Sequence, residues 1–257
     1  MYFNQVPAKT GYLWFKQGLQ LFWENLTIFL MGSLGYTLLM LLISSAPVLG
    51  HYLPLVLLPL VTICFMTVCR NTLNHESTSP IALLASLRTT FSQRVVWQLL
   101  LLGLCQAFAL FILVFLIQKV ALLNAQPKIM ESNPLILFVL MLAMILSSIA
   151  NAMLLWFSPA LTAWRQVPLH KAIFFSGVVC WRNLSAIVVH GLLWLGFACA
   201  LSLIVFSILS AFGSTEEQIK QNLIFIMQII LVPVSFCTRY ASYISCFPTE
   251  PPPTIQS

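Results

Sequence analysis

The sequence predicts an all-α fold, a polytopic bundle of six transmembrane helices with three amphipathic helices at the cytoplasmic side of the membrane. Two features of composition carry this prediction: 60% of the 257 residues are hydrophobic and only 7% are charged. A soluble domain usually carries about 25% charged residues, so this chain could not cover a water-facing surface. A third feature is the wide spacing of the charges, which leaves apolar stretches long enough to cross a bilayer.

The uncharged stretches place the spans in order along the chain. A charge at the bilayer centre costs roughly 2.5–3.5 kcal/mol, so charged residues are expected to flank the spans. Residues 25–69 contain no charge and have room for two helices of about 20 residues, with a turn at "SSAPVLGHY" (44–52). Four further uncharged stretches each have room for one helix. The predicted spans are 26–45, 51–69, 95–117, 135–157, 185–208 and 222–243.

Three segments directly ahead of span pairs are predicted to be amphipathic helices lying in the membrane surface. They are "VPAKTGYLWFKQGLQLFWEN" (6–25), "SPIALLASLRTTFSQR" (79–94) and residues 168–183. In the third, Lys171 and Arg182 share one stripe of the helix, from which both cations can reach water. Asn183 is a polar break before the fifth span. The residues expected to anchor these helices at the interface are Trp14, Lys16, Lys171, Trp181 and Arg182.

A short helix followed by a pair of spans occurs three times, which predicts a repeat within one transmembrane domain, residues 1–247. The repeats would cover roughly 6–70, 80–165 and 168–243. The alternative is that there is no repeat, because amphipathic segments often precede membrane spans. The remaining residues, 248–257, include three consecutive prolines and are predicted to form an extended, disordered tail.

The positive charges predict that both termini lie in the cytoplasm. Lys and Arg concentrate in the cytoplasmic loops of membrane proteins. With the N-terminus inside, nine cations fall on the cytoplasmic side: Lys9, Lys16, Arg70, Arg88, Arg94, Arg165, Lys171, Arg182 and Arg239. Three cations fall on the other side: Lys119, Lys128 and Lys220.

One stretch of the chain carries a resemblance to a known family. It is residues 156–194, "WFSPALTAWRQVPLHKAIFFSGVVCWRNLSAIVVHGLLW". The matching features are Phe157, Pro159, Ala160, Ala163-Trp164, Lys171-Ala172, Phe174-Phe175-Ser176 and Cys180-Trp181-Arg182-Asn183. Here the chain resembles a family of uncharacterised bacterial inner-membrane proteins that is named only after a locus tag. "RYASYISCF" (239–247) is similar to the family's closing segment, and a weaker likeness extends over nearly the whole chain. The resemblance implies a six-helix protein of the bacterial inner membrane and implies no particular activity.

The sequence lacks complete signatures of membrane enzymes. "HEST" (75–78) has no second histidine for an HExxH zinc site, "FFSG" (174–177) has no first glycine for a rhomboid-like GxSG motif, and the chain contains no Asp for an aspartyl dyad. The seven cysteines show no paired spacing, so neither a disulfide framework nor a metal site is indicated. The sequence therefore predicts no enzyme and no cofactor. The net charge of +6 forms no basic run, so the lipid bilayer is the predicted partner rather than nucleic acid.

Polar side chains inside the predicted spans remain as candidate functional residues. They are Gln106, Asn151, His190 and Gln228. One interpretation is a polar path, in which His190 could relay a proton or meet a ligand. The other is interhelical hydrogen bonding, worth about 0.6 kcal/mol per contact. Two functions are thus open: a non-enzymatic structural or partner-binding protein, or a small-solute transporter or channel. A water-filled cavity that touches all four residues would favour the transporter.

Overall fold

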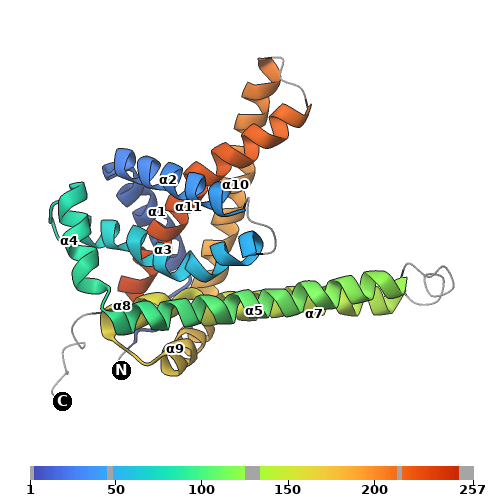
Figure 1. The fold of residues 1–257 in the computed structure, drawn as a ribbon, viewed down its shortest axis with the longest axis horizontal. Coiled ribbons are helices and arrows are strands. Elements are labelled where there is room, and N and C mark those ends of the chain that lie inside the picture. Colours follow the sequence, from blue (N-terminus) through green and yellow to red (C-terminus); the bar gives the residue numbers. More distant parts are fainter. Residues whose placement is uncertain (1–2, 45–48, 125–133, 213–215, 249–257) are drawn as a thin grey trace.

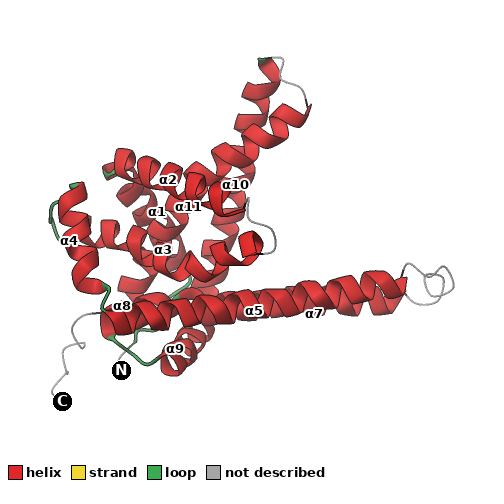
Figure 2. Cartoon of the chain, in the orientation of Figure 1, coloured by secondary structure: helices red, strands yellow, loops and turns green. Residues whose placement is uncertain are grey.

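The chain is built from helices. The computed structural model describes residues 3–44, 49–124, 134–212 and 216–248, and over these ranges the chain forms helices and no strands (Figure 2). In chain order they are α1 (Lys9–Glu24), α2 (Leu26–Ser44), α3 (Leu49–Leu73), α4 (Pro80–Thr90), α5 (Gln93–Asn124), α7 (Pro134–Trp156), α8 (Ser158–Arg165), α9 (Leu169–Arg182), α10 (Leu184–Ala211) and α11 (Glu216–Cys246). The predicted all-α class is confirmed. The predicted tail, apart from Pro248, lies outside the described residues.

Six stretches in the described helices are long and apolar enough to cross a membrane, as predicted. They are Leu26–Ile43, Tyr52–Leu73, Gln93–Gln118, Met141–Arg165, Leu184–Ala211 and Gln221–Cys246. Several helices run further than the predicted spans. For example, α5 continues beyond residue 117 to Asn124, and α11 continues beyond residue 243 to Cys246. Arg239, within the predicted sixth span, faces the interior of the protein.

The spans pair into three hairpins, α2–α3, α5–α7 and α10–α11, which diverge from a common base (Figure 1). The α5–α7 hairpin runs along the long axis of the molecule, and the α10–α11 hairpin leans away from it. α3 links the three hairpins, because it contacts α2, α5 and α11. At the base, α1 packs against α10 and α11, and α9 packs against α7 and α8.

The core lies at this base, where α3, α5, α8 and α11 meet. Each of these helices contributes a side chain that exposes none of its surface: Ile63, Leu99, Leu161 and Val234. Phe65 stacks between Phe29 and Phe236, with ring centroids 6.3 and 5.2 Å away. Towards the hairpin tips, large apolar side chains are exposed, as expected of surfaces that face lipid. Examples are Phe108, Phe115, Phe138, Leu203 and Phe206.

The segments predicted as surface helices form three separate helices, but these pack differently. α1 buries one face against α10 and α11, made of Gly11, Trp14, Gly18, Leu21 and Phe22. α4 is capped by the Ser79 hydroxyl, which accepts from the Ala82 N–H, yet α4 buries none of its own residues. Because α1 is part of the core and α4 is not, the threefold repeat stays a prediction.

The third of these helices, α9, is separated from the fifth span at Asn183, where the sequence places the break. Asn183 has φ −110° and ψ 24°, which interrupts the helix. Its side chain bonds the N-terminal segment: Oδ1 accepts from the Val6 N–H at 2.7 Å, and Nδ2 donates to the Asn4 carbonyl at 3.2 Å. The helix predicted over 168–183 begins one residue later, at Leu169, because Pro168 has an extended ψ of 142°.

The start of the chain also contacts its far end. The Asn4 N–H donates to the Cys246 carbonyl at 2.8 Å. The N-terminal segment, the α9–α10 break and the end of α11 therefore meet at one end of the molecule, at the base of the hairpins.

Candidate ligand pocket around Arg239

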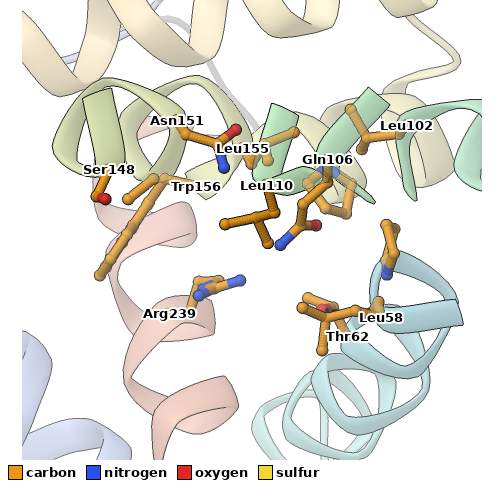
Figure 3. A pocket seen from close by; sticks show the side chains of 13 residues that line it. Leu58, Thr62, Leu102, Gln106, Leu110, Ser148, Asn151, Leu155, Trp156 and Arg239 are labelled. Carbon is orange, nitrogen blue, oxygen red and sulfur yellow. Dashed lines mark hydrogen bonds between the residues drawn. The ribbon is translucent and has the colours of Figure 1, made fainter. Parts of the chain in front are cut away.

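A pocket of about 250 Å³ lies where α3, α5, α7, α8 and α11 meet (Figure 3). Most of its wall is apolar. Its polar side chains all come from the apolar stretches that could cross the membrane. They are Thr62, Gln106, Ser148, Asn151 and Arg239. This cavity, the Arg239 pocket, gathers the polar groups of four spans in one place.

Arg239 is held in the wall of the pocket by aromatic rings. Its Cζ lies 5.0 Å from the centre of the Trp156 ring and 5.9 Å from that of Phe236. Its Nε is buried and has no hydrogen-bond partner. Among the described residues, no carboxylate lines the pocket. Cation–π contacts contribute roughly 0.5–2 kcal/mol each, and they leave the N–H groups of the guanidinium available.

Hydrogen bonds fix the ring beneath the guanidinium. Trp156 ends α7, and its indole N–H donates to the Ser242 hydroxyl at 3.1 Å. That hydroxyl donates in turn to the backbone carbonyl of Arg239 at 2.7 Å. The end of α7 is thus tied to the turn of α11 that carries the arginine.

The two amides in the pocket are also available. Figure 3 shows Gln106 from α5 and Arg239 from α11 extending towards the same space. Each amide group has two N–H donors and one acceptor oxygen, and neither Gln106 nor Asn151 makes a hydrogen bond with the described part of the chain. The hydroxyls of Thr62 and Ser148 instead donate to carbonyls of their own helices, at 2.8 and 2.9 Å. The described ranges contain no group of three or more His, Cys, Asp or Glu side chains suited to a metal ion, so the pocket's chemistry is hydrogen-bond donation and positive charge.

The structure brings together two of the four polar residues singled out from the sequence. Gln106 and Asn151 line the Arg239 pocket. His190 is 1% exposed on α10 and packs against the Trp156 and Trp14 rings, at 5.8 and 6.1 Å between centroids. Gln228 is exposed on α11. One cavity therefore does not touch all four residues.

The predicted interfacial anchors differ in their exposure. Four are exposed: Lys16, Lys171, Trp181 and Arg182. Trp14 is 1% exposed, because α1 lies against α10 and α11 and turns this ring towards protein. The sequence offers no means of telling these surroundings apart, since protein and lipid are both apolar. Anchoring by the four exposed residues stays a prediction.

Arg239 is the pocket residue that sequence reasoning missed, because it was counted as a cytoplasmic charge at the end of the sixth span. α11 runs to Cys246, so Arg239 lies about 10 Å inside that end at the standard helical rise. The available signal was the apolar character of the residues that follow. They are Ala241, Tyr243, Ile244, Cys246 and Phe247, and they allow the helix to continue beyond the charge.

Six membrane-length apolar stretches in the described residues, four of which line a small pocket, define a multi-pass membrane protein. The chain is 34% identical over 260 residues to a Burkholderia thailandensis protein described as a probable inner membrane protein, in an alignment that covers 96% of this chain and 94% of that protein. The chain therefore belongs to the family of this inner membrane protein, which confirms the resemblance found in its sequence. No protein-family profile matches it, and no solved structure matches it.

Proposed function

We propose that this protein is a non-enzymatic inner-membrane protein that binds a small anionic ligand in the Arg239 pocket. One observation carries the proposal: a guanidinium faces a cavity within the membrane region and, among the described residues, has no carboxylate beside it. A charged side chain at the centre of a bilayer costs roughly 2.5–3.5 kcal/mol or more. A bound anion would offset this cost, because opposite charges attract strongly where the dielectric constant is low.

The alternative role for a buried arginine is structural. Arginines within membrane spans usually pair with other charges or with backbone carbonyls. Arg165, in the same protein, donates to two backbone carbonyls, whereas the Arg239 guanidinium donates to no described residue. This difference favours a ligand as the missing partner of Arg239.

The rest of the pocket is suited to an anion of modest size. The amides of Gln106 and Asn151 bring further N–H donors, while its apolar side chains exclude water and strengthen each charged contact. About 250 Å³ is close to the lower end of the range for small-molecule sites. A carboxylate or a phosphate group on a small molecule is the ligand class that fits.

The hydroxyl groups of the pocket support binding rather than catalysis. Thr62 and Ser148 both use their hydrogens on their own helices. His190, which could act as a base, packs on another helix among tryptophan rings. A nucleophile needs a base within hydrogen-bonding distance, and the pocket's hydroxyls and His190 are not arranged in that way.

A small-solute transporter or channel is the second candidate. The observation that favours it is the meeting of Gln106 and Asn151 in a pocket within the spans. The exposed position of Gln228 and the aromatic surroundings of His190 favour a binding site over a continuous polar path. Uptake of the bound anion into proteoliposomes would identify a transporter, and binding without uptake would identify a binding protein.

We place both termini in the cytoplasm, with the exposed anchors of α1 and α9 at the inner membrane surface. Nine of the twelve cations support this orientation. The contact between the Asn4 N–H and the Cys246 carbonyl supports a common side for the two ends. Reporter fusions after Ser257 and within residues 124–133 are expected to report opposite sides of the membrane.

Thermal unfolding of the purified protein tests the binding site. Acetate, benzoate and inorganic phosphate would be titrated separately at constant ionic strength, with Arg239→Gln beside the wild type. Arg94→Gln is the matched control, because Arg94 is exposed outside the pocket. We expect at least one anion to raise the unfolding temperature saturably in the wild type and the control, and not in Arg239→Gln. Equal protection of all three proteins would refute a site at Arg239.

A further inference from the structure

A second cavity, of about 770 Å³, lies between the ends of α3, α8 and α11. Its polar side chains are Arg70, Asn74, Trp164, Arg165, Tyr240 and Tyr243, and it is called the Arg70–Arg165 cleft here. It is separate from the Arg239 pocket, because Arg239 and Tyr240 are consecutive on α11 and successive helical residues point about 100° apart.

The cleft lies at the level where spans end. The second, fourth and sixth apolar stretches end at Leu73, Arg165 and Cys246, and the first two of these residues line the cleft. The phosphate groups of lipids occupy the layer next to the hydrocarbon core. A ligand in the cleft would therefore lie beside the lipid headgroups.

Arg165 is held rigidly in the cleft wall. Its Nη2 donates to the carbonyls of Phe247 and Pro248 at 2.8 and 2.9 Å, and its Nε donates to the Tyr243 hydroxyl at 3.3 Å. Its Cζ also lies 5.6 Å from the centre of the Phe247 ring. These contacts fix the guanidinium and leave Nη1 free to bind a ligand.

Arg70 approaches the same space from α3. Its Cζ lies 5.7 Å from the centre of the Trp164 ring, which orients its guanidinium, and no hydrogen bond joins that group to a described residue. The indole Nε1 of Trp164 is buried and also lacks a partner. The cleft thus combines two oriented positive charges and an unused indole N–H, and its lining contains no carboxylate among the described residues.

We propose that the Arg70–Arg165 cleft binds a phosphate group, with Arg70 and Arg165 as its charged contacts and Trp164 as a further donor. Arginine presents N–H groups in a planar fork that matches the oxygens of a phosphate. Basic pockets between membrane helices on the cytoplasmic side are suited to the headgroups of anionic phospholipids. The phosphate could belong to such a lipid or to a soluble molecule, and the depth of the cleft favours the lipid.

The test uses the purified full-length protein in a mild detergent. Phosphatidylglycerol, phosphatidylcholine and inorganic phosphate are titrated separately, and the midpoint of thermal protection is measured for each. Arg70→Gln is the informative variant, because Arg70 is exposed and its loss should leave the fold intact. Arg88→Gln on α4 is the matched control, since it removes the same charge from an exposed helix outside the cleft. Trp164→Phe keeps an aromatic ring beside Arg70 and removes only the indole N–H.

We expect phosphatidylglycerol to protect the wild type and Arg88→Gln at the same midpoint. Arg70→Gln should need roughly tenfold more lipid, as for one lost charge-assisted hydrogen bond, and Trp164→Phe should show a smaller shift in the same direction. Protection by inorganic phosphate with the same dependence on Arg70 would support the site and identify a soluble ligand. An equal loss in Arg88→Gln, or equal protection by phosphatidylcholine with no effect of Arg70→Gln, would overturn the proposal. Arg239→Gln should leave this binding unchanged, which separates the test from that of the Arg239 pocket.

Discussion

Arg239 and Arg165 place the same chemical group in two different settings within one protein. Arg165 lies where the fourth span ends, and its guanidinium donates to two backbone carbonyls and a tyrosine hydroxyl. Arg239 lies inside the sixth span, and its described contacts are the Trp156 and Phe236 rings. The fold uses Nε and Nη2 of Arg165 and leaves its Nη1 free, whereas the Arg239 guanidinium donates to no described residue. This difference supports a structural role for Arg165 and is the reason for the proposal that Arg239 binds a ligand.

The largest expected effect near Arg239 concerns the reactivity of Cys180, a buried thiol on α9, compared with an exposed thiol on the same helix. Burial raises the pKa of Cys180 to about 12, and the nearby Arg239 charge, which lowers it, is too weak to reverse the shift. An ordinary cysteine has a pKa of about 8.5, so at pH 8 the thiolate of Cys180 should be on the order of a thousandfold scarcer. Maleimide labelling should be slower by a similar factor than that of Lys171→Cys on the exposed side of α9. The rate should rise about tenfold per pH unit, and comparable rates at pH 8 would show that Cys180 is accessible.

Arg165→Gln should give the largest change in stability. It removes charged donors from the carbonyls of Phe247 and Pro248, both bonded at the end of α11. Each hydrogen bond to a charged group contributes about 1.5–3 kcal/mol and two are lost, so a loss of about 3–6 kcal/mol is expected in reversible unfolding by detergent. Arg88→Gln, on the exposed surface of α4, should change stability by less than about 0.5 kcal/mol. A similar small effect for both variants would mean that Arg165 is not structural.

Gly103→Ala should affect the Arg239 pocket and spare the cleft. A Cβ at Gly103 on α5 would collide with the backbone carbonyl of Val56 on α3, and both helices form the pocket wall. Such overpacking costs about 1–3 kcal/mol. Gly196→Ala is the control, because a Cβ there meets nothing within 4 Å. We expect Gly103→Ala to weaken the protection against thermal unfolding that the anion gives, while the protection given by phosphatidylglycerol persists. Loss of both would show that the two sites are not independent.

Features that depend on the position of residues along the chain could be predicted from the sequence. The wide gaps between charges placed the spans, and the polar Asn183 placed the break between α9 and α10. Both follow from local rules: charges avoid the hydrocarbon, and a polar side chain that bonds the backbone interrupts a helix.

Features that depend on lateral packing could not be predicted in this way. All four polar residues, Gln106, Asn151, His190 and Gln228, were candidates because they lie inside predicted spans, but the way the hairpins meet decides which of them share a cavity. Trp14 lies against protein because α1 happens to pack on α10 and α11. Arg239 was counted as a cytoplasmic charge because the rule for counting cations in loops has no provision for a charge that faces a cavity.

Unfolding of Arg239→Gln with and without the anion identified for the wild type tests most directly whether Arg239 serves a ligand. Replacing an uncompensated buried charge with a neutral side chain often stabilises a protein, so without anion the variant should be more stable than the wild type by about 1–2 kcal/mol. Added anion should then stabilise the wild type and leave the variant unchanged. A variant that is destabilised as strongly as Arg165→Gln and still protected by the anion would contradict the account, because Arg239 would then be a structural residue like Arg165.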